Sequence, residues 1–280
     1  MTDIAIRNVS KIFGSNWKTA LAMTRDGVDK AAILAKTGCS VGLDNVSLDI
    51  AGSRVFVIMG LSGSGKSTLV RHINRLIEPT SGEILVGGSN VLDLNPKDLR
   101  SFRNRRVSMV FQNFGLMPHR TVLQNVIYGQ RVRGLSTAEA DPIGMKWIET
   151  VGLAGYENKM PHQLSGGMKQ RVGLARALAA DTDVILMDEA FSALDPLIRA
   201  DMQDQLLQLE KNLSKTIVFI THDLDEALRI GAQIAILKDG KLVQVGTPDD
   251  ILNRPASDYV ARFVQRRAGA GNAAGHAHHD

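Results

Sequence analysis

A glycine-rich segment between an apolar run and a helix-forming run is the feature that most constrains this chain. The segment Gly60–Ser67 reads GLSGSGKS, follows RVFVIM directly and precedes TLVRHINRLI. Its glycines allow backbone N–H groups to converge on one anion, and the N-terminus of the next helix adds partial positive charge. The pattern predicts a phosphate-binding loop in which Lys66 reaches the β- and γ-phosphates and the Ser67 hydroxyl ligates Mg²⁺. The expected ligand-binding residues of this loop are Gly60, Leu61, Ser62, Gly63, Ser64, Gly65, Lys66, Ser67 and Thr68.

The rest of the chain fits the fold that such a loop requires. Short β-branched runs alternate with helical periodicity, which predicts an α/β fold with a mostly parallel sheet. The expected strands are Asp3–Val9, Leu43–Ile50, Arg54–Met59, Val107–Phe111, Val184–Met187 and Ile217–Ile220. The expected helices are Lys66–Ile77, Val122–Val132, Ala138–Val151, Gly167–Ala180, Leu197–Asn212 and Asp258–Gln265. The turn Lys238–Gly240 predicts an antiparallel hairpin near the end of the chain.

Composition excludes several classes of protein. The chain has 280 residues, of which 44% are hydrophobic and 22% charged, so we expect a folded protein with one or two cores. No run approaches the roughly 20 apolar residues of a membrane helix, and the N-terminus lacks a signal peptide, so we expect neither a membrane span nor secretion. The 33 basic residues are interspersed with 29 acidic ones, so we expect no nucleic-acid partner. Cys39 is the sole cysteine, which is typical of a reducing cytosol.

Two segments depart from the α/β pattern. Residues 15–42 have helical spacing and a stop signal at Gly38, so we expect a peripheral helical insertion, to which no chemistry can be assigned. Residues 266–280 are rich in Gly and Ala and lose apolar periodicity, which predicts a disordered tail.

Two acidic residues follow the apolar strand VILM. Because ligands bind at the carboxyl ends of parallel strands, Asp188 could hold a Mg²⁺ shell through water, and Glu189 could polarise an attacking water. An isolated apolar run that ends in Asp-Glu is more often an ordinary strand terminus. The phosphate-binding loop in the same chain favours the functional interpretation.

A second helix N-terminus that could bind an anion precedes that strand. In LSGGMKQR, Leu164–Arg171, Ser165 can cap a helix, and Gly166 and Gly167 leave its backbone open to an anion. Taken alone, this segment would more often be a plain capped helix. LSGGM followed by VILMDE resembles the signature and Walker B motifs of the ATP-binding cassette (ABC) ATPases.

This resemblance implies an ABC nucleotide-binding domain over residues 1–265. In that family a P-loop core with a mostly parallel sheet carries an antiparallel β subdomain and a helical subdomain, which we place at about residues 113–165. ATP is the implied nucleotide. A head-to-tail dimer of two copies is also implied, because the signature of one subunit closes on the γ-phosphate held by the other.

The resemblance also assigns residues outside the motifs above. Gln112 matches the glutamine that senses Mg²⁺ and the γ-phosphate and links the site to the transmembrane partner. Asp195 ends SALD, which matches the D-loop, and His222 matches the switch histidine, which contacts the γ-phosphate and positions water. Phe13 matches the aromatic residue that stacks on adenine, the alternative being an ordinary core phenylalanine. The implied roles are therefore catalytic for Lys66, Gln112, Glu189 and His222, and metal-binding for Ser67, Gln112 and Asp188.

A subgroup of the family is closer still. KIFG, the insertion ending in KTG, and DEAFSALDPLIR resemble ATPase subunits of bacterial quaternary-amine importers, which take up glycine betaine, choline or proline betaine. This implies transmembrane permease partners, an indirect solute-binding protein at the periplasm or surface, and a peripheral location on the cytoplasmic face of the plasma membrane. We expect no CBS regulatory module, which favours a nutritional role such as choline uptake. The alternative is a soluble ABC-type ATPase without a membrane partner, although such proteins typically have two cassettes or a coiled-coil insertion.

Overall fold

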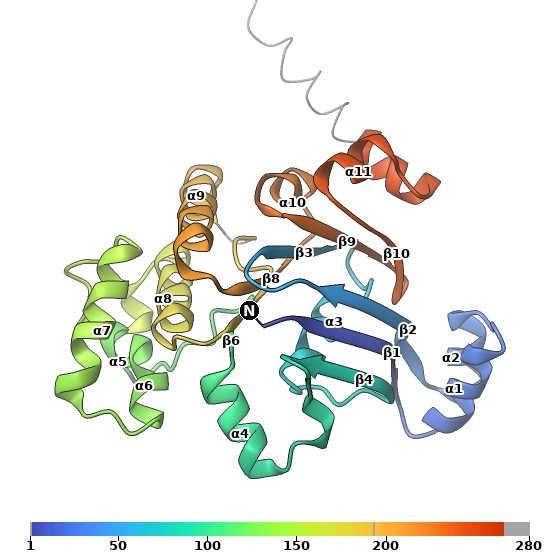
Figure 1. Cartoon of the computed structure of the whole chain (residues 1–280), viewed down its shortest axis with the longest axis horizontal. Helices are drawn as coiled ribbons and strands as arrows, with labels where there is room; N and C mark the ends of the chain where they lie inside the picture. Colours follow the sequence, from blue (N-terminus) through green and yellow to red (C-terminus); the bar gives the residue numbers. More distant parts are fainter. Residues whose placement is uncertain (1, 193, 266–280) are drawn as a thin grey trace, which may run out of the picture. The chain divides into compact units, whose positions relative to one another are not determined.

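The computed structural model describes residues 2–192 and 194–265, which form two compact units (Figure 1). The sheet-rich unit contains residues 3–51, 55–92 and those from Ile220 onward, and the helix-rich unit contains residues 2, 52–54 and 93–219. The tail expected at 266–280 lies outside the described residues. Within the part of the chain that is described, no helix is both long enough and apolar enough to cross a bilayer.

The sheet-rich unit carries two groups of strands. Its elements are β1 (Ile4–Phe13), α1 (Trp17–Arg25), α2 (Lys30–Thr37), β2 (Ser40–Ile50), β3 (Val55–Met59), α3 (Lys66–Ile73), β4 (Ser81–Val86), β5 (Ser89–Asn90), α10 (Leu224–Ile230), β9 (Gln233–Lys238), β10 (Lys241–Gly246), α11 (Pro248–Asn253) and a last helix over residues 258–265. One sheet is antiparallel, in the order β2-β1-β4-β5. In the other group, β9 lies between β10, which is antiparallel to it, and β3, which is parallel.

The predicted hairpin is the β9–β10 pair. Lys241 lies opposite Lys238, and the two turn residues Asp239 and Gly240 have positive φ of 49° and 73°. Positive φ at both central positions is the backbone geometry of a tight two-residue hairpin turn, which explains the glycine. The hairpin prediction is therefore confirmed.

The predicted insertion forms two helices, α1 and α2, beside β1 and β2 (Figure 1). Apolar residues of the insertion and the two strands form one buried cluster, made of Ile12, Ala20, Ile33, Cys39 and Val41. Gly38 caps α2 in a left-handed conformation with φ 68°, as its stop signal predicts. The helical part is shorter than expected, because β2 already begins at Ser40.

The helix-rich unit contains a parallel pair of strands and most of a third strand. Its elements are α4 (Pro96–Arg105), β6 (Val107–Val110), α5 (Val122–Val126), α6 (Tyr128–Val132), α7 (Thr137–Thr150), α8 (Gly166–Ala179), β7 (Val184–Asp188), α9 (Pro196–Leu213) and most of β8 (Thr216–Thr221). A short 3₁₀ turn lies in this unit at Pro161–Gln163, whereas the one at Val91–Asp93 has its first two residues in the sheet-rich unit. Strand β7 lies between β6 and β8, and Val107 is opposite Val184 in the parallel β6–β7 register. Every residue of β7 is buried, as its apolar sequence predicts.

Several elements differ from the sequence-based prediction, and three of these differences have a clear local reason. The helix expected over 66–77 ends at Ile73, because Arg75 has a φ of 53° that no α-helix continues through. The helix expected over 122–132 is two short helices that meet at Ile127. Helix α4 was not predicted, since none of its residues is buried and it shows no apolar stripe.

Candidate functional site

The phosphate-binding loop predicted from GLSGSGKS joins β3 to α3. Helix α3 begins at Lys66, and its N-cap Gly65 has a φ of 98°, which a residue with a side chain rarely adopts. The Lys66 side chain is 5% exposed, and its Nζ donates to the carbonyl oxygens of Gly60 at 2.8 Å and Leu61 at 3.0 Å. The Lys66 side chain therefore folds back over the loop, and its ammonium bonds to the first two loop residues.

The shape of this loop fits an anion. A Cβ on Gly60 would lie 2.3 Å from the Leu237 carbonyl oxygen, whereas a Cβ on Gly63 would meet no atom within 4 Å. The loop is thus closely supported on one side and open at Gly63. The Ser64 Oγ is buried and has no hydrogen-bond partner among the described residues, so it remains available to a ligand. Loop glycines, a lysine and a helix N-terminus are what a phosphate group requires.

Neighbouring segments hold the loop in place. The Gly240 amide donates to the Ser64 carbonyl at 3.0 Å, and the Asp44 amide donates to the Gly240 carbonyl at 2.8 Å. From the last helix, the Tyr259 hydroxyl bonds to the backbone of Leu61. Burial raises the pKa of that hydroxyl, while the bond to Leu61 opposes the increase. The loop is therefore braced by the β9–β10 turn and by the last helix.

Phe13 lies at the end of β1, close to this loop. Its side chain is 41% exposed, so the alternative of a core phenylalanine is wrong. The edge of the ring faces Gly42, where a Cβ would lie 2.7 Å from Phe13 Cε2, and the Gly42 carbonyl in turn abuts Gly65. The Lys11 Nζ lies 5.1 Å from the ring centroid. An exposed aromatic face next to a phosphate loop can stack on a base.

His222 is exposed and directly follows β8, at the start of the segment that leads into α10. The next residue, Asp223, caps α10 by accepting from the amides of Asp225 at 2.9 Å and Glu226 at 3.3 Å. This cap fixes the start of α10 at Leu224, two residues after the histidine.

In the helix-rich unit, two predicted residues meet. Val110 lies opposite Met187 in the parallel register, so the segments that follow β6 and β7 leave the sheet at the same edge. There the Gln112 Nε2 donates to the Glu189 Oε2 at 3.1 Å. Glu189 has a φ of 48°, and its carbonyl accepts from the Ser192 hydroxyl at 2.9 Å, which fixes the turn. Asp188, the last residue of β7, is fully buried.

The glycine-flanked helix start also forms as predicted. Ser165 is the N-cap of α8, and its side chain accepts from the Met168 amide at 3.3 Å. Ser165 and Gly166 are exposed, and a Cβ on Gly166 would meet nothing within 4 Å. The α8 N-terminus is therefore open to a ligand. By contrast, the Asp195 carboxylate is used as the N-cap of α9, where it accepts from the Ile198 amide at 3.0 Å.

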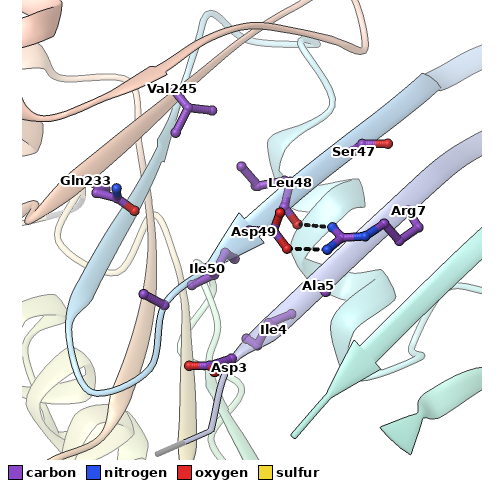
Figure 2. Close-up of a pocket in the computed structure, with 11 residues that line it drawn as sticks. Asp3, Ile4, Ala5, Arg7, Ser47, Leu48, Asp49, Ile50, Gln233 and Val245 are labelled. Atoms are coloured by element: carbon purple, nitrogen blue, oxygen red, sulfur yellow. Dashed lines mark hydrogen bonds and ion pairs between the residues drawn. The ribbon is translucent and has the colours of Figure 1, made fainter. Parts of the chain in front are cut away.

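A separate hollow on the sheet-rich unit carries no comparable chemistry (Figure 2). Arg7 of β1 and Asp49 of β2, which pair at 2.5 Å, are among the residues that line it. Both side chains are substantially exposed and neutralise one another, so we assign no ligand there.

The candidate residues fall into two sets by unit. Phe13, the phosphate loop and His222 belong to the sheet-rich unit, and Gln112, Ser165–Gly167, Asp188, Glu189 and Asp195 belong to the helix-rich unit. Sequence reasoning missed the braces of the loop, Gly240 and Tyr259. The turn sequence Lys238-Asp239-Gly240 was a signal for the first, and the sequence offers no signal for the second.

The glycine loop between β3 and α3, with Lys66 bonded across it, defines a P-loop protein. The Gln112–Glu189 pair and the open helix start at Ser165 are features of the nucleotide-binding cassette class. Comparison with known proteins agrees. The profile of the family described as "ABC transporter" matches residues 43–192. The chain belongs to the ABC transporter family.

Several relatives are similar over nearly the whole chain. The glycine betaine transport ATP-binding protein OpuAA of Bacillus subtilis is 54% identical over 94% of this chain, and the glycine betaine/proline betaine transport system ATP-binding protein ProV of Escherichia coli is 53% identical over 94%. This chain spans 63% and 66% of the lengths of those two proteins. The trimethylamine N-oxide transport system ATP-binding protein TmoW of Ruegeria pomeroyi is 51% identical over 94% of this chain and 77% of its own length.

A solved structure shares the fold. The dimeric structure of MJ0796, described as a bacterial ABC transporter cassette, has a TM-score of 0.75 and 32% identity, over 88% of this chain and 98% of that one. The α/β prediction with a P-loop cassette core, an antiparallel sheet and helices is confirmed.

Proposed function

We propose that this chain is the ATP-hydrolysing, energy-coupling subunit of an ABC importer for small quaternary amines. The observation that carries the proposal is the 54% identity, over 94% of the chain, to a glycine betaine transport ATP-binding protein. The geometry of the phosphate loop and of the Gln112–Glu189 pair supports the ATPase part independently.

In this proposal the phosphate loop binds the nucleotide. The loop amides and the Lys66 ammonium hold the β- and γ-phosphates, and the adenine stacks on Phe13. Leu61 and Ser62 lie between the first two glycines of the loop, and Thr68 lies in the first turn of α3, where its hydroxyl can also face the nucleotide. Ser67, Gln112 and Asp188 would hold Mg²⁺ through oxygen atoms, the ligands this ion prefers, and the ion supplies positive charge to the phosphates.

Glu189 is the proposed general base. Its carboxylate accepts a hydrogen bond from the Gln112 amide at 3.1 Å, which orients it to take a proton from the attacking water. His222 and Lys66 stabilise the charge that develops on the transferred phosphoryl group.

A second copy of the chain completes the proposed active unit. The exposed N-terminus of α8, with Ser165, Gly166 and Gly167, would close on the γ-phosphate bound by the other copy. Asp195, which caps α9, would lie at the same dimer interface. Closure would drive the transmembrane permease, to which a solute-binding protein delivers the amine, and the chain would act at the cytoplasmic face of the membrane.

Glycine betaine is the first solute to test. Three relatives named for glycine betaine, alone or with carnitine or proline betaine, match at 53 to 54% identity over 94 to 95% of the chain. One relative named for choline alone matches at 43% over 81%, and one named for glycine betaine, carnitine and choline matches at 42% over 81%. This ranking favours glycine betaine over the choline uptake that the sequence suggested. The ATPase subunit itself is not expected to touch the solute.

The test is uptake of labelled glycine betaine, choline and trimethylamine N-oxide in the native host. The wild type is compared with a chromosomal Glu189→Gln strain and with a Glu83→Gln control, a matched change at an exposed residue of β4. We expect Glu189→Gln to lose glycine betaine uptake and Glu83→Gln to retain it. Normal uptake of all three solutes in the Glu189→Gln strain, with the chain absent from membrane fractions, would favour a soluble ABC-type ATPase instead.

A further inference from the structure

The helical insertion contacts the segment that braces the phosphate loop. Lys30 is the first residue of α2, and its Nζ donates to the Val41 carbonyl of β2 at 2.8 Å. The same ammonium lies against Gly240, where a Cβ would be only 2.8 Å from it. The side chain therefore fills the space between α2, β2 and the β9–β10 turn.

From Gly240 the contacts lead directly to the loop. The Gly240 amide donates to the Ser64 carbonyl at 3.0 Å. A Cβ on Gly240 would lie 2.6 Å from the Gly42 carbonyl oxygen, and a Cβ on Gly65 would lie 2.8 Å from that same oxygen. Lys30, Gly240, Gly42 and the loop residues Ser64 and Gly65 thus form one continuous set of close contacts, all within the sheet-rich unit.

Acidic neighbours partly offset the cost of burying the Lys30 ammonium. Lys30 is partly buried, and burial lowers the pKa of its ammonium, while Asp239 and then Asp44 raise it, and Lys241 lowers it. Asp44 also pairs with Lys241 at 3.1 Å. Two carboxylates therefore face two ammonium groups, which keeps a charged donor at this position tolerable.

We infer that the α1–α2 insertion is a positioning element for the phosphate loop, and that Lys30 is its positioning residue, acting on Ser64 and Gly65 through Gly240 and Gly42. Lys30 does not touch the phosphate in this inference. It holds the β9–β10 turn against the loop, so that the loop amides keep the arrangement that binds an anion. The inference rests on the proposed ATP binding.

The test is nucleotide affinity of the purified full chain. Lys30→Met removes the hydrogen-bond donor and the positive charge but retains most of the side-chain length. Lys30→Arg retains the donor and the charge. Lys36→Met makes the same change at an exposed lysine of the same helix. The Kd for a fluorescent ATP analogue is measured by titration, KM and kcat for ATP by phosphate release, and Tm without nucleotide.

We expect Lys30→Met to raise Kd and KM for ATP by about 3- to 10-fold, the scale of one lost hydrogen bond, while kcat changes less than KM. Lys30→Arg and Lys36→Met should stay within about 2-fold of the wild type. A lower Tm with unchanged Kd in Lys30→Met would mean a purely structural lysine and would overturn the inference. Absence of ATP binding by the wild type would refute the proposed function itself, which is a separate outcome.

Discussion

His72 makes the stability of this protein depend on pH in a calculable way. It lies on α3 with no exposed surface, its Nδ1 bonds to the Thr68 carbonyl, and its Nε2 has no partner within the described residues. Burial lowers its pKa from 6.5 to about 4, although the Thr68 bond opposes this. The folded protein thus holds a neutral imidazole at pH 5, where an unfolded histidine is protonated. Because the unfolded state binds more protons between about pH 4 and 6.5, stability rises with pH in that window and is level above it.

The size of the effect follows from the two pKa values. At pH 4.5 the unfolded histidine is almost fully protonated and the folded one is mostly neutral, so folding loses about 2 to 3 kcal/mol relative to pH 7.5. His72→Gln removes the titration and retains an amide that can donate to the Thr68 carbonyl. Urea unfolding followed by circular dichroism at both pH values measures the free energy of unfolding of each protein.

We expect the free energy of unfolding of the wild type to fall by about 2 to 3 kcal/mol more than that of His72→Gln over this interval. His162→Gln, at an exposed histidine, should retain the pH dependence of the wild type. If wild type and His72→Gln lose stability in parallel, the histidine is not held neutral in the folded state and the reasoning fails.

Four changes test the candidate site itself. Glu189→Gln should slow ATP hydrolysis by the purified chain by about 10²- to 10⁴-fold and leave ATP affinity intact, and near-normal turnover would exclude it as the base. Lys66→Ala should weaken ATP binding by about 10- to 100-fold in a titration, and an unchanged Kd would contradict its phosphate role. Phe13→Ala should raise the Kd for ATP by about 5- to 150-fold and Phe13→Tyr should not, whereas equal Kd values for both would argue against stacking. Gly60→Ala should lower Tm, because its Cβ would lie 2.3 Å from the Leu237 carbonyl oxygen at a φ of 152°, and an unchanged Tm would show that the loop can shift.

The sequence by itself determined the features that depend on a short window of the chain. The loop between β3 and α3, the Ser165 cap of α8 and the Gly38 stop of α2 all form where their local signals predict. Such signals work because capping, positive φ and the period of apolar residues are properties of a few neighbouring residues. The sequence also indicated that Gln112 and Glu189 each follow an apolar strand, but that the two strands are neighbours and the side chains bond came only from the structure.

Only the tertiary structure decided which distant residues support the loop. Lys30, Gly240 and Ser64 are brought together by the packing of a helix, a hairpin and a loop, and no window of the sequence contains two of them. The same holds for the burial of His72, which no local sequence pattern predicts and which results from the packing of α3 into the core. Local propensity sets the backbone of each element, whereas burial and long-range contacts depend on how the elements pack, so the roles of these residues follow from the fold and not from the pattern.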